Sequence, residues 1–197
     1  MLPREIDCGP CLLRPWRRSD REALLLHADD RGVWRNLRDR FPHPYTEADA
    51  DEWLAHAADE PVPAGTWAVD VDGVAAGTVS LHRGRDDERC AAEIGYWLGA
   101  SFRGRGIATA AVRAATGAAL AEPELFRVFA AVFAWNPASM RVLEKAGYLR
   151  EGVMVRGTLK DGVLVDRVLY ARTRDPGLPY VPAAPRAAAF RSGERHR

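Results

Sequence analysis

The sequence predicts a single domain of the α/β class, more narrowly α+β, with a mixed, mostly antiparallel, twisted sheet flanked by helices. A strand-like run (91–98) leads through a glycine turn into an alanine-rich helix pattern (107–120), and an apolar run (126–133) follows. The order strand, helix, strand predicts one parallel crossover. Asp-Gly pairs at 72–73 and 161–162 predict two antiparallel hairpins. A chain of 197 residues suits one domain.

The first third of the chain predicts one strand and two helices. Residues 11–16 read as a strand, and Ser19 with Glu22 has the spacing of a capping box that begins a helix. Thr46 with Asp49 has the same spacing. Residues 34–45 lie between the two helices and are rich in Arg, Trp, Phe and Pro. We expect an irregular loop there, of the kind that often lines a binding site.

The remaining elements follow from turn and cap residues. Asn136 and Pro137 have the residue types of a helix start, and Gly147 suits a helix end. The chain after Asp175 is rich in Pro, Ala and Arg. We therefore expect a domain over residues 1–174 and a flexible tail over 175–197. The hairpin strands are expected at 66–71, 74–81, 154–160 and 163–171, and a solvated loop at 83–89.

Composition excludes several classes of protein. A formal net charge of +1 gives no overall field for nucleic acid or an anionic membrane. No apolar run is long enough to span a bilayer, and the first residues have no signal-peptide core. We expect a cytoplasmic protein that binds neither nucleic acid nor membrane.

Cys8-Gly9-Pro10-Cys11 has the spacing of a thioredoxin-like redox motif. That chemistry needs a preceding strand and a helix N-terminus at the first cysteine. We expect neither here, and no second ligand pair suggests a metal site. A short turn entering the first strand is the preferred interpretation. A redox protein stays as an alternative, and it would depend on both cysteines.

The glycine turn Arg103-Gly104-Arg105-Gly106 opens a helix, and such a turn suits a phosphate. Free backbone N–H groups point outward, and glycine lets a ligand approach the backbone. A Walker A loop would need a Gly-Lys-Ser/Thr ending, and a dinucleotide site would need an acidic residue after the next strand. Neither is present. The pattern Arg-x-x-Gly-x-Ala, in contrast, fits this turn directly.

These blocks together resemble the GNAT superfamily of acyl-CoA N-acyltransferases, and within it the RimJ/RimL branch. The similarity extends over nearly all of residues 11–173. The segments that carry it are the glycine turn, Glu93-Ile94-Gly95-Tyr96-Trp97-Leu98, Asn136-Pro137-Ala138-Ser139, Leu143-Glu144-Lys145-Ala146-Gly147-Tyr148 and the hairpin from Asp161 to Asp166.

The resemblance implies a fold with a splayed central strand pair, acetyl-CoA as cosubstrate and no metal. Gly95 fits this, because glycine inside a strand suggests a bulge or a close approach. The pyrophosphate would lie at the glycine turn and the pantetheine in the strand gap. The implied cofactor-binding residues are Tyr96, Trp97, Leu98, Arg103, Gly104, Arg105, Gly106, Ile107, Ala108, Thr109, Asn136 and Ser139.

Acetyl transfer also needs groups that move protons. Many members of the superfamily use a tyrosine where this chain has Leu143, and the RimJ/RimL branch has a serine where Ser139 stands. Ser139 is thus the candidate donor, although a serine near a helix start can simply bond its own backbone. Glu93 is the candidate base, or else the cross-strand partner of an arginine. His82 and Asp166 are reserves.

The acceptor is expected to be a primary amine, either a peptide N-terminus or an amino acid or other small molecule. It would attack acetyl-CoA directly in a ternary complex. Trp34, Arg38, Phe41 and Tyr45 belong to the loop where the family binds its acceptor. The family also allows a homodimer. A non-catalytic acyl-CoA sensor is the alternative, and it would not need Ser139.

Overall fold

The computed structural model describes residues 2–59 and 65–182. One eight-stranded sheet has the order β1-β2-β3-β4-β5-β6-β8-β7. The strands are β1 (Ile6–Asp7), β2 (Leu12–Arg14), β3 (Thr66–Val71), β4 (Val74–Arg83), β5 (Ala91–Leu98), β6 (Arg127–Phe133), β7 (Leu149–Lys160) and β8 (Val163–Thr173). The α-helices are α1 (Arg21–Ala28), α2 (Arg31–Trp34), α3 (Glu47–Asp59), α4 (Ile107–Leu120) and α5 (Pro137–Lys145).

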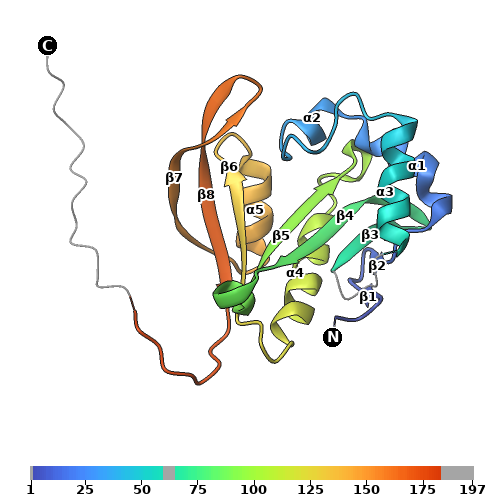
Figure 1. The fold of residues 1–197 in the computed structure, drawn as a ribbon. Coiled ribbons are helices and arrows are strands. Elements are labelled where there is room, and N and C mark those ends of the chain that lie inside the picture. The colour runs from blue at the N-terminus through green and yellow to red at the C-terminus, as the bar shows by residue number, and fades with distance from the viewer. Residues whose placement is uncertain (1, 60–64, 183–197) are drawn as a thin grey trace, which may run out of the picture.

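The sheet divides between β5 and β6. All other neighbouring strands pair antiparallel, whereas β5 and β6 pair in parallel, and only Ala91–Glu93 with Arg127–Phe129. Beyond these residues the two strands separate, and Figure 1 shows the two arms of the sheet diverging on either side of α5. The predicted fold class, with its parallel crossover and splayed strand pair, is confirmed.

Helices cover both faces of the sheet (Figure 1). On one face α4 and α5 pack on the main core, where Ile107, Val112 and Leu143 are buried. On the other face α1 and α3 enclose a second core around Trp16, Leu24 and related side chains. The two layers hold β5 between them, so each face of this strand meets a different set of helices.

Several local signals in the sequence produce the expected structure. The Thr46 and Asp49 side chains exchange hydrogen bonds with each other's backbone N–H groups at the start of α3. The Asn136 side chain accepts from the backbone N–H of Ser139 at the start of α5. Both Asp-Gly pairs have positive φ at each residue, as two-residue hairpin turns require.

The helix after the first strand begins at Arg21, so the predicted start at Ser19 is wrong. Residues 18–20 form a short 3-10 turn, and Asp20 is the residue before α1. The Asp20 carboxylate binds the guanidinium of Arg14, which is only 1% exposed, and Asp70 binds the same arginine. A buried charge must be paired. The same carboxylate accepts from the backbone N–H of Arg17 over 2.8 Å, so Asp20, and not Ser19, holds the chain at the helix start.

The cysteine motif lies in a tight turn between two short strands. The expectation that no strand precedes it is wrong, because β1 pairs with β2 on either side. The backbone N–H of Cys8 donates to the carbonyl of Cys11 over 2.9 Å. The predicted turn is present. Its first cysteine is not at a helix N-terminus, where a redox thiolate would be stabilised.

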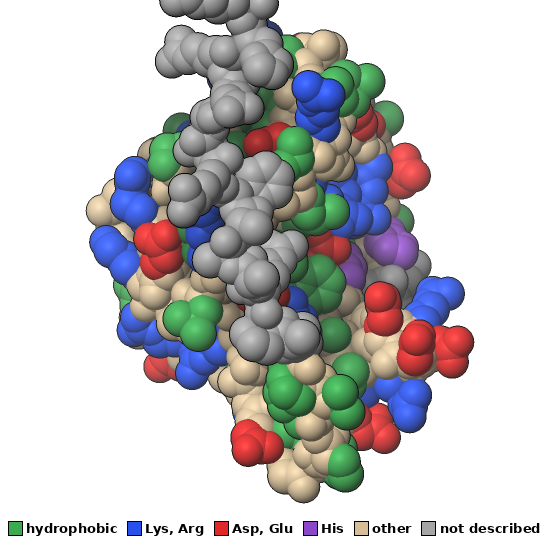
Figure 2. Space-filling view, turned by 90° about the vertical axis from the view of Figure 1, so that its left-hand side faces the viewer, with side chains coloured by type: hydrophobic (Ala, Val, Ile, Leu, Met, Phe, Trp, Pro, Cys, Tyr) green, Lys and Arg blue, Asp and Glu red, His purple; other side chains and the backbone are tan. Residues whose placement is uncertain are grey.

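The surface and the chain end complete the description. Figure 2 shows basic and acidic side chains interspersed over the face that it presents. Within residues 2–59 and 65–182, none of the helices is long and apolar enough to cross a membrane. The described chain after Thr173 forms no helix or strand up to residue 182, and the rest of the predicted tail, 183–197, lies outside the described residues.

Candidate functional site

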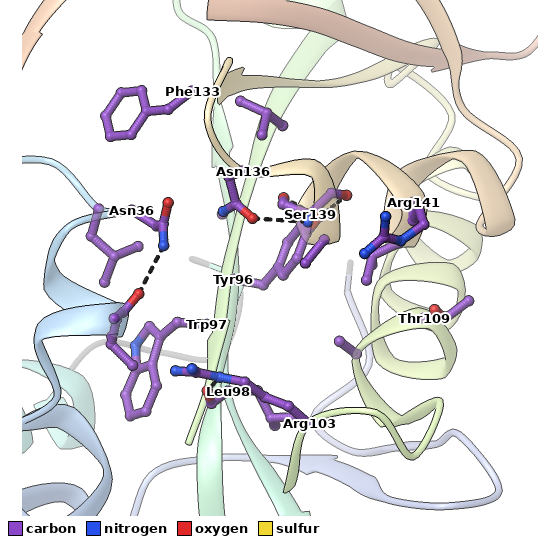
Figure 3. A pocket seen from close by; sticks show the side chains of 18 of the residues that line it. Asn36, Tyr96, Trp97, Leu98, Arg103, Thr109, Phe133, Asn136, Ser139 and Arg141 are labelled. Carbon is purple, nitrogen blue, oxygen red and sulfur yellow. Dashed lines mark hydrogen bonds between the residues drawn. The ribbon is translucent and has the colours of Figure 1, made fainter. Parts of the chain in front are cut away.

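A cavity of about 510 Å³ lies where β5 and β6 diverge. One wall is the second half of β5, from Gly95 to Leu98. The start of α4, helix α5, the end of β6 and residues between 32 and 38 form the others. Figure 3 shows Tyr96 directed toward Ser139 across this space, with Arg103 and Thr109 at the α4 end. The separation of the two strands therefore opens a site in the middle of the sheet.

The start of α4 forms an anion-binding end of this cavity. Gly104 and Gly106 have φ values of 77° and 79°, which glycine adopts without strain. The first N–H groups of a helix have no acceptor within the helix, and the helix dipole favours a negative charge there. The cavity lining includes both glycines together with Ile107, Ala108 and Thr109.

The two arginines of the glycine turn lie differently. Arg103 lines the cavity; its Nε donates to the Leu98 carbonyl over 3.0 Å, and its Nη2 is 3.4 Å from Asp30. Arg105 is not among the lining residues, and its guanidinium lies 5.8 Å from the centre of the Phe102 ring.

Two basic residues that our sequence analysis missed take the place of Arg105. Arg141 and Lys145 line the cavity from α5. Their spacing of four residues puts them on one face of that helix. This spacing, after the Asn136-Pro137 start signal, was the signal that could have found them.

Ser139 lies in a small hydrogen-bonded network. Its backbone N–H donates to Asn136 Oδ1 over 3.1 Å, and its Oγ is 2.7 Å from the hydroxyl of Tyr96. The same hydroxyl donates to the Ser139 carbonyl over 3.1 Å. Burial raises the pKa of Tyr96 well above its usual range, although the hydrogen bond to Ser139 acts in the opposite direction. Tyr96 is therefore a neutral donor next to Ser139.

Leu143, at the position of the usual superfamily tyrosine, has no exposed surface and packs in the main core. The tyrosine in this site comes instead from β5. The family resemblance places Tyr96 among the cofactor-binding residues but gives its hydroxyl no role. The alternation of side chains along the strand directs Tyr96 to the α5 face and its neighbours Gly95 and Trp97 to the other.

Glu93 contacts two arginines at the point where β5 and β6 separate. Its Oε2 accepts from Arg38 Nη2, and its Oε1 is 3.6 Å from Arg167 Nη2. Glu93 was expected to be either the general base or the cross-strand partner of an arginine. It does pair with arginines, although they come from the loop and from β8 and not from a neighbouring strand. His82 lies opposite Glu93 in the β4–β5 register, with Nε2 3.1 Å from Ser80 Oγ.

The other reserve, Asp166, is elsewhere. Its carboxylate accepts from the backbone N–H of Arg156 over 2.7 Å, at a β7 residue with positive φ. It lines neither of the two cavities described here. Asp166 thus holds the irregular part of the β7–β8 hairpin.

The β4–β5 register continues without a shift through Gly95, so the bulge considered for that glycine is not present. A Cβ at Gly95 would instead lie 3.1 Å from Ser80 Oγ.

A second cavity, of about 1040 Å³, lies on the opposite face of β5. Arg38, Phe41 and Tyr45 line it, as expected for the loop. Side chains of α3 and β4 form its other walls. The two cavities share Leu37, Arg38, Glu93, Gly95, Tyr96 and Trp97, so they meet at the middle of β5.

Trp34 lines neither cavity and supports the loop instead. Its ring lies 4.0 Å from the ammonium of Lys160 and stacks on His43. The Lys160 side chain is 1% exposed and contacts Asp39 Oδ1 over 2.7 Å. The tip of the β7–β8 hairpin thereby holds the loop that lines the second cavity.

The family of the chain follows from comparison with known proteins. The model of the family described as "Acetyltransferase (GNAT) domain" matches residues 11–149. The chain belongs to this family. The GNAT relatives include the Bacillus subtilis protein YdaF, named as a ribosomal N-acetyltransferase, which is 40% identical over 100 residues. YjcK of the same organism, named as an N-acetyltransferase, is 41% identical over 95 residues.

These alignments cover 51% and 48% of this chain, and it spans about half the length of the two relatives, 54% and 52%. Solved structures share the fold over a larger part. A GNAT-family acetyltransferase from Bacillus anthracis has a TM-score of 0.72 at 24% identity, with 86% of this chain and 98% of that chain covered. RimL, an acetyltransferase of the ribosomal L7/L12 N-terminus solved with coenzyme A, has a TM-score of 0.76 at 22% identity, covering 87% and 99%.

Proposed function

We propose that this protein is an acetyl-CoA-dependent N-acetyltransferase that moves an acetyl group to a primary amine. The observation that carries the proposal is the pair of cavities on opposite faces of β5, which meet beside Gly95 and Tyr96. A donor on one face and an acceptor on the other would come together at that point. Direct attack in a ternary complex needs this arrangement.

The residues present suit acetyl-CoA, which supplies the activated acetyl group. The glycine-rich start of α4 offers backbone N–H groups to the pyrophosphate, and Arg103, Arg141 and Lys145 add positive charge around the same end. Asn136 lines the same cavity and would contact the pantetheine. Backbone groups of β5 beyond Glu93 do not pair with β6, so they are available to the thioester carbonyl.

Ser139 is the proposed proton donor to the thiolate of coenzyme A. The single proton of the Tyr96 hydroxyl points to the Ser139 carbonyl, and its oxygen lies 2.7 Å from Ser139 Oγ, where it can hold the serine hydroxyl until that hydroxyl gives its proton to the departing sulfur. Tyr96 acts as a positioning residue, because its raised pKa keeps the phenol neutral. The sulfur gains the proton when the bond from carbonyl carbon to sulfur breaks.

The amine must lose a proton during the reaction. Glu93 lies where the two cavities meet and is a candidate to accept it. Both of its oxygens already face a guanidinium, so accepting a proton would require one of these contacts to open. The Ser80–His82 pair on the neighbouring strand is the second candidate, since it lines the acceptor cavity.

The acceptor class follows from the relatives only in outline. YdaF and RimL are named for ribosomal proteins, and RimL for an N-terminus. A solved neighbour, the microcin C7 self-immunity acetyltransferase MccE, was crystallised with acetyl-CoA and AMP. We therefore propose either a protein N-terminus or a small-molecule amine. The alternative, a non-catalytic acyl-CoA sensor, would need the α4 end but not the second cavity.

The test is a measurement of coenzyme A release from acetyl-CoA across peptides, amino acids, polyamines and aminoglycosides. Acetylation of at least one amine at a rate above hydrolysis is the expected result. Tight acetyl-CoA binding without any acetyl transfer would favour the sensor. The Cys8→Ser, Cys11→Ser double variant is the control for the redox alternative, and it should transfer acetyl groups at the same rate.

A further inference from the structure

Arg38, Glu93 and Arg167 form a charged cluster where the two cavities meet. We propose that this cluster is a subsite for an anionic oxygen group, a carboxylate or a phosphate, carried by the acceptor. The substrates would then be amines that bear such a group close to the nitrogen. This inference rests on the proposed function, because it names the acceptor class of the same site.

The charges of the cluster do not balance. Two guanidinium groups share the single carboxylate of Glu93, and this leaves one positive charge. Burial lowers the pKa of Arg167, the charge of Arg38 lowers it further, and Glu93 acts in the opposite direction. An arginine stays charged under these conditions. A second anion at this place would therefore find a favourable potential.

Hydrogen-bond donors are also left over. The Arg167 side chain is 19% exposed, and its Nη2 donates to the Ala131 carbonyl over 3.1 Å. Its buried Nε has no hydrogen-bond partner within the described part of the chain. Leaving a buried donor unsatisfied costs about 1–3 kcal/mol. A ligand oxygen that received this hydrogen would remove the cost, and a guanidinium edge suits a two-oxygen group.

The cluster is both reachable and firmly held. Arg38 is 55% exposed and lines both cavities, so an acceptor in the second cavity can reach it. Arg167 lines the first cavity and not the second, so the anionic group would reach it beside Glu93, which lines both. Arg167 comes from the middle of β8, which is paired on both sides. Asp39, the neighbour of Arg38, is anchored by Lys160. The two guanidiniums are therefore set in place before a ligand binds.

The other charges of the second cavity orient the acceptor. Asp49 and Glu52 of α3 line it away from the cluster, together with His56. These carboxylates disfavour an anion at the α3 wall. The basic residues Arg40, Arg83 and Arg85 also line this cavity, and Arg83 contacts Glu124. Among residues 2–59 and 65–182, the cluster is the place where two guanidiniums contact one carboxylate close to Gly95, the proposed meeting point of amine and thioester.

The experiment uses acceptors that differ in one anionic group. L-Phenylalanine is compared with its amide, the dipeptide Ala-Glu-amide with Ala-Gln-amide, and phosphoethanolamine with ethanolamine. The first two pairs test carboxylates and the third tests phosphate. We expect a KM at least tenfold lower for the anionic member of at least one pair. Equal KM values in all three pairs, or a preference for the neutral members, would overturn the subsite.

Variants assign the effect to the cluster. Arg167→Gln should raise KM for the anionic acceptor about tenfold, a loss of about 1.4 kcal/mol, and change KM for the neutral partner less than twofold. Arg38→Gln should act in the same direction, and Arg167→Lys should keep part of the effect. Arg172→Gln is the matched control, an arginine of the same strand that lines neither cavity and donates to the Ala146 carbonyl, and it should leave both values unchanged.

The outcomes separate the two proposals. Equal losses for charged and neutral acceptors would show that Arg167 supports the fold, and they would overturn the subsite alone. Failure of every amine to be acetylated would overturn the proposed function. In that case calorimetry with the same acceptors, in the presence of coenzyme A, decides the subsite. The subsite is supported if the anionic acceptor binds more tightly than its neutral partner and Arg167→Gln weakens that binding. It is rejected if the two acceptors bind with equal Kd.

Discussion

The two cavities on either side of β5 are built in different ways. The anion-binding end of the first uses backbone groups that are close together in sequence, in the turn from Arg103 to Thr109. The second depends on side chains that meet from distant parts of the chain. Arg38 and Glu93 are 55 residues apart, and Asp39 and Lys160 are 121 residues apart.

This difference predicts how each side responds to substitution. A backbone cradle tolerates changed side chains but not a changed conformation. A site of long-range side-chain contacts is lost when one partner is replaced. Acetyl-CoA binding and acceptor binding should therefore be separable by single substitutions.

The largest effect is expected where the two sides meet. Ser139→Ala should lower kcat about 100-fold, a typical loss for a general acid, while the Kd for acetyl-CoA changes little. Tyr96→Phe should lower kcat about tenfold, because it removes one charge-neutral hydrogen bond that orients the serine.

The double variant sharpens this prediction. If Tyr96 acts through Ser139, the second substitution should add almost nothing to the first. Steady-state kinetics of the two single variants and the double variant check this. Fully additive losses would mean that Tyr96 has a separate role, and an unchanged kcat in Ser139→Ala would remove the serine from the mechanism.

On the donor side we expect an intermediate effect from Gly106→Ala. Its φ of 79° is costly for alanine, by about 1–2 kcal/mol, so the turn should relax and weaken acetyl-CoA binding about tenfold. Gly117→Ala is the control. Gly117 lies inside α4 with open space around its Cα, and alanine there should stabilise the protein by about 0.5–1 kcal/mol. Calorimetry measures the Kd for acetyl-CoA, and thermal unfolding measures the stability of both variants. A Kd in Gly106→Ala equal to that of the unsubstituted protein would contradict a backbone cradle.

A smaller effect is expected from Lys160→Met on the acceptor side. It removes the contacts with Asp39 and Trp34 that hold the loop. KM for the acceptor should rise about three- to fivefold, equivalent to about 1 kcal/mol, with the Kd for acetyl-CoA unchanged. Lys145→Met is the mirror control, because that lysine lines the first cavity, and it should affect acetyl-CoA only. If either variant changed both the KM for the acceptor and the Kd for acetyl-CoA, the two cavities would not be separable.

The smallest effect concerns pH. Burial disfavours the charged phenolate and raises the pKa of Tyr96, so the group stays protonated up to pH 9. Tyr96→Phe should lower kcat by the same factor at every pH from 6 to 9. Plots of log kcat against pH for Tyr96→Phe and for the unsubstituted protein should therefore be parallel. A difference in the pH at which kcat rises or falls would show that Tyr96 itself titrates during the reaction.

The sequence predicted the locally determined features of the chain better than those that depend on distant contacts, and the reason is physical. The α4 start, the α5 cap and both hairpin turns are local signals, in which the residues that interact are close in sequence. The start of α1 was predicted wrongly because Arg14 binds Asp20 and Asp70 through the core. The site roles of Tyr96 and Arg167 depend on which face of a strand they occupy once the sheet divides. No local pattern contains that information.

The short pairing between β5 and β6 has a consequence for the lifetime of the protein. Three residue pairs of the β5–β6 ladder join the two arms of the sheet, and side-chain contacts such as Arg167 with Glu93 add to them, so we expect local opening at this seam. A ligand that bridges the arms adds RT ln(1 + [L]/Kd) to the free energy of unfolding, about 2.7 kcal/mol at 100 times Kd. If acetyl-CoA bridges them as proposed, its concentration in the cell would set how often the chain unfolds and meets a protease. Nutrient supply would then control the amount of this protein as well as its rate.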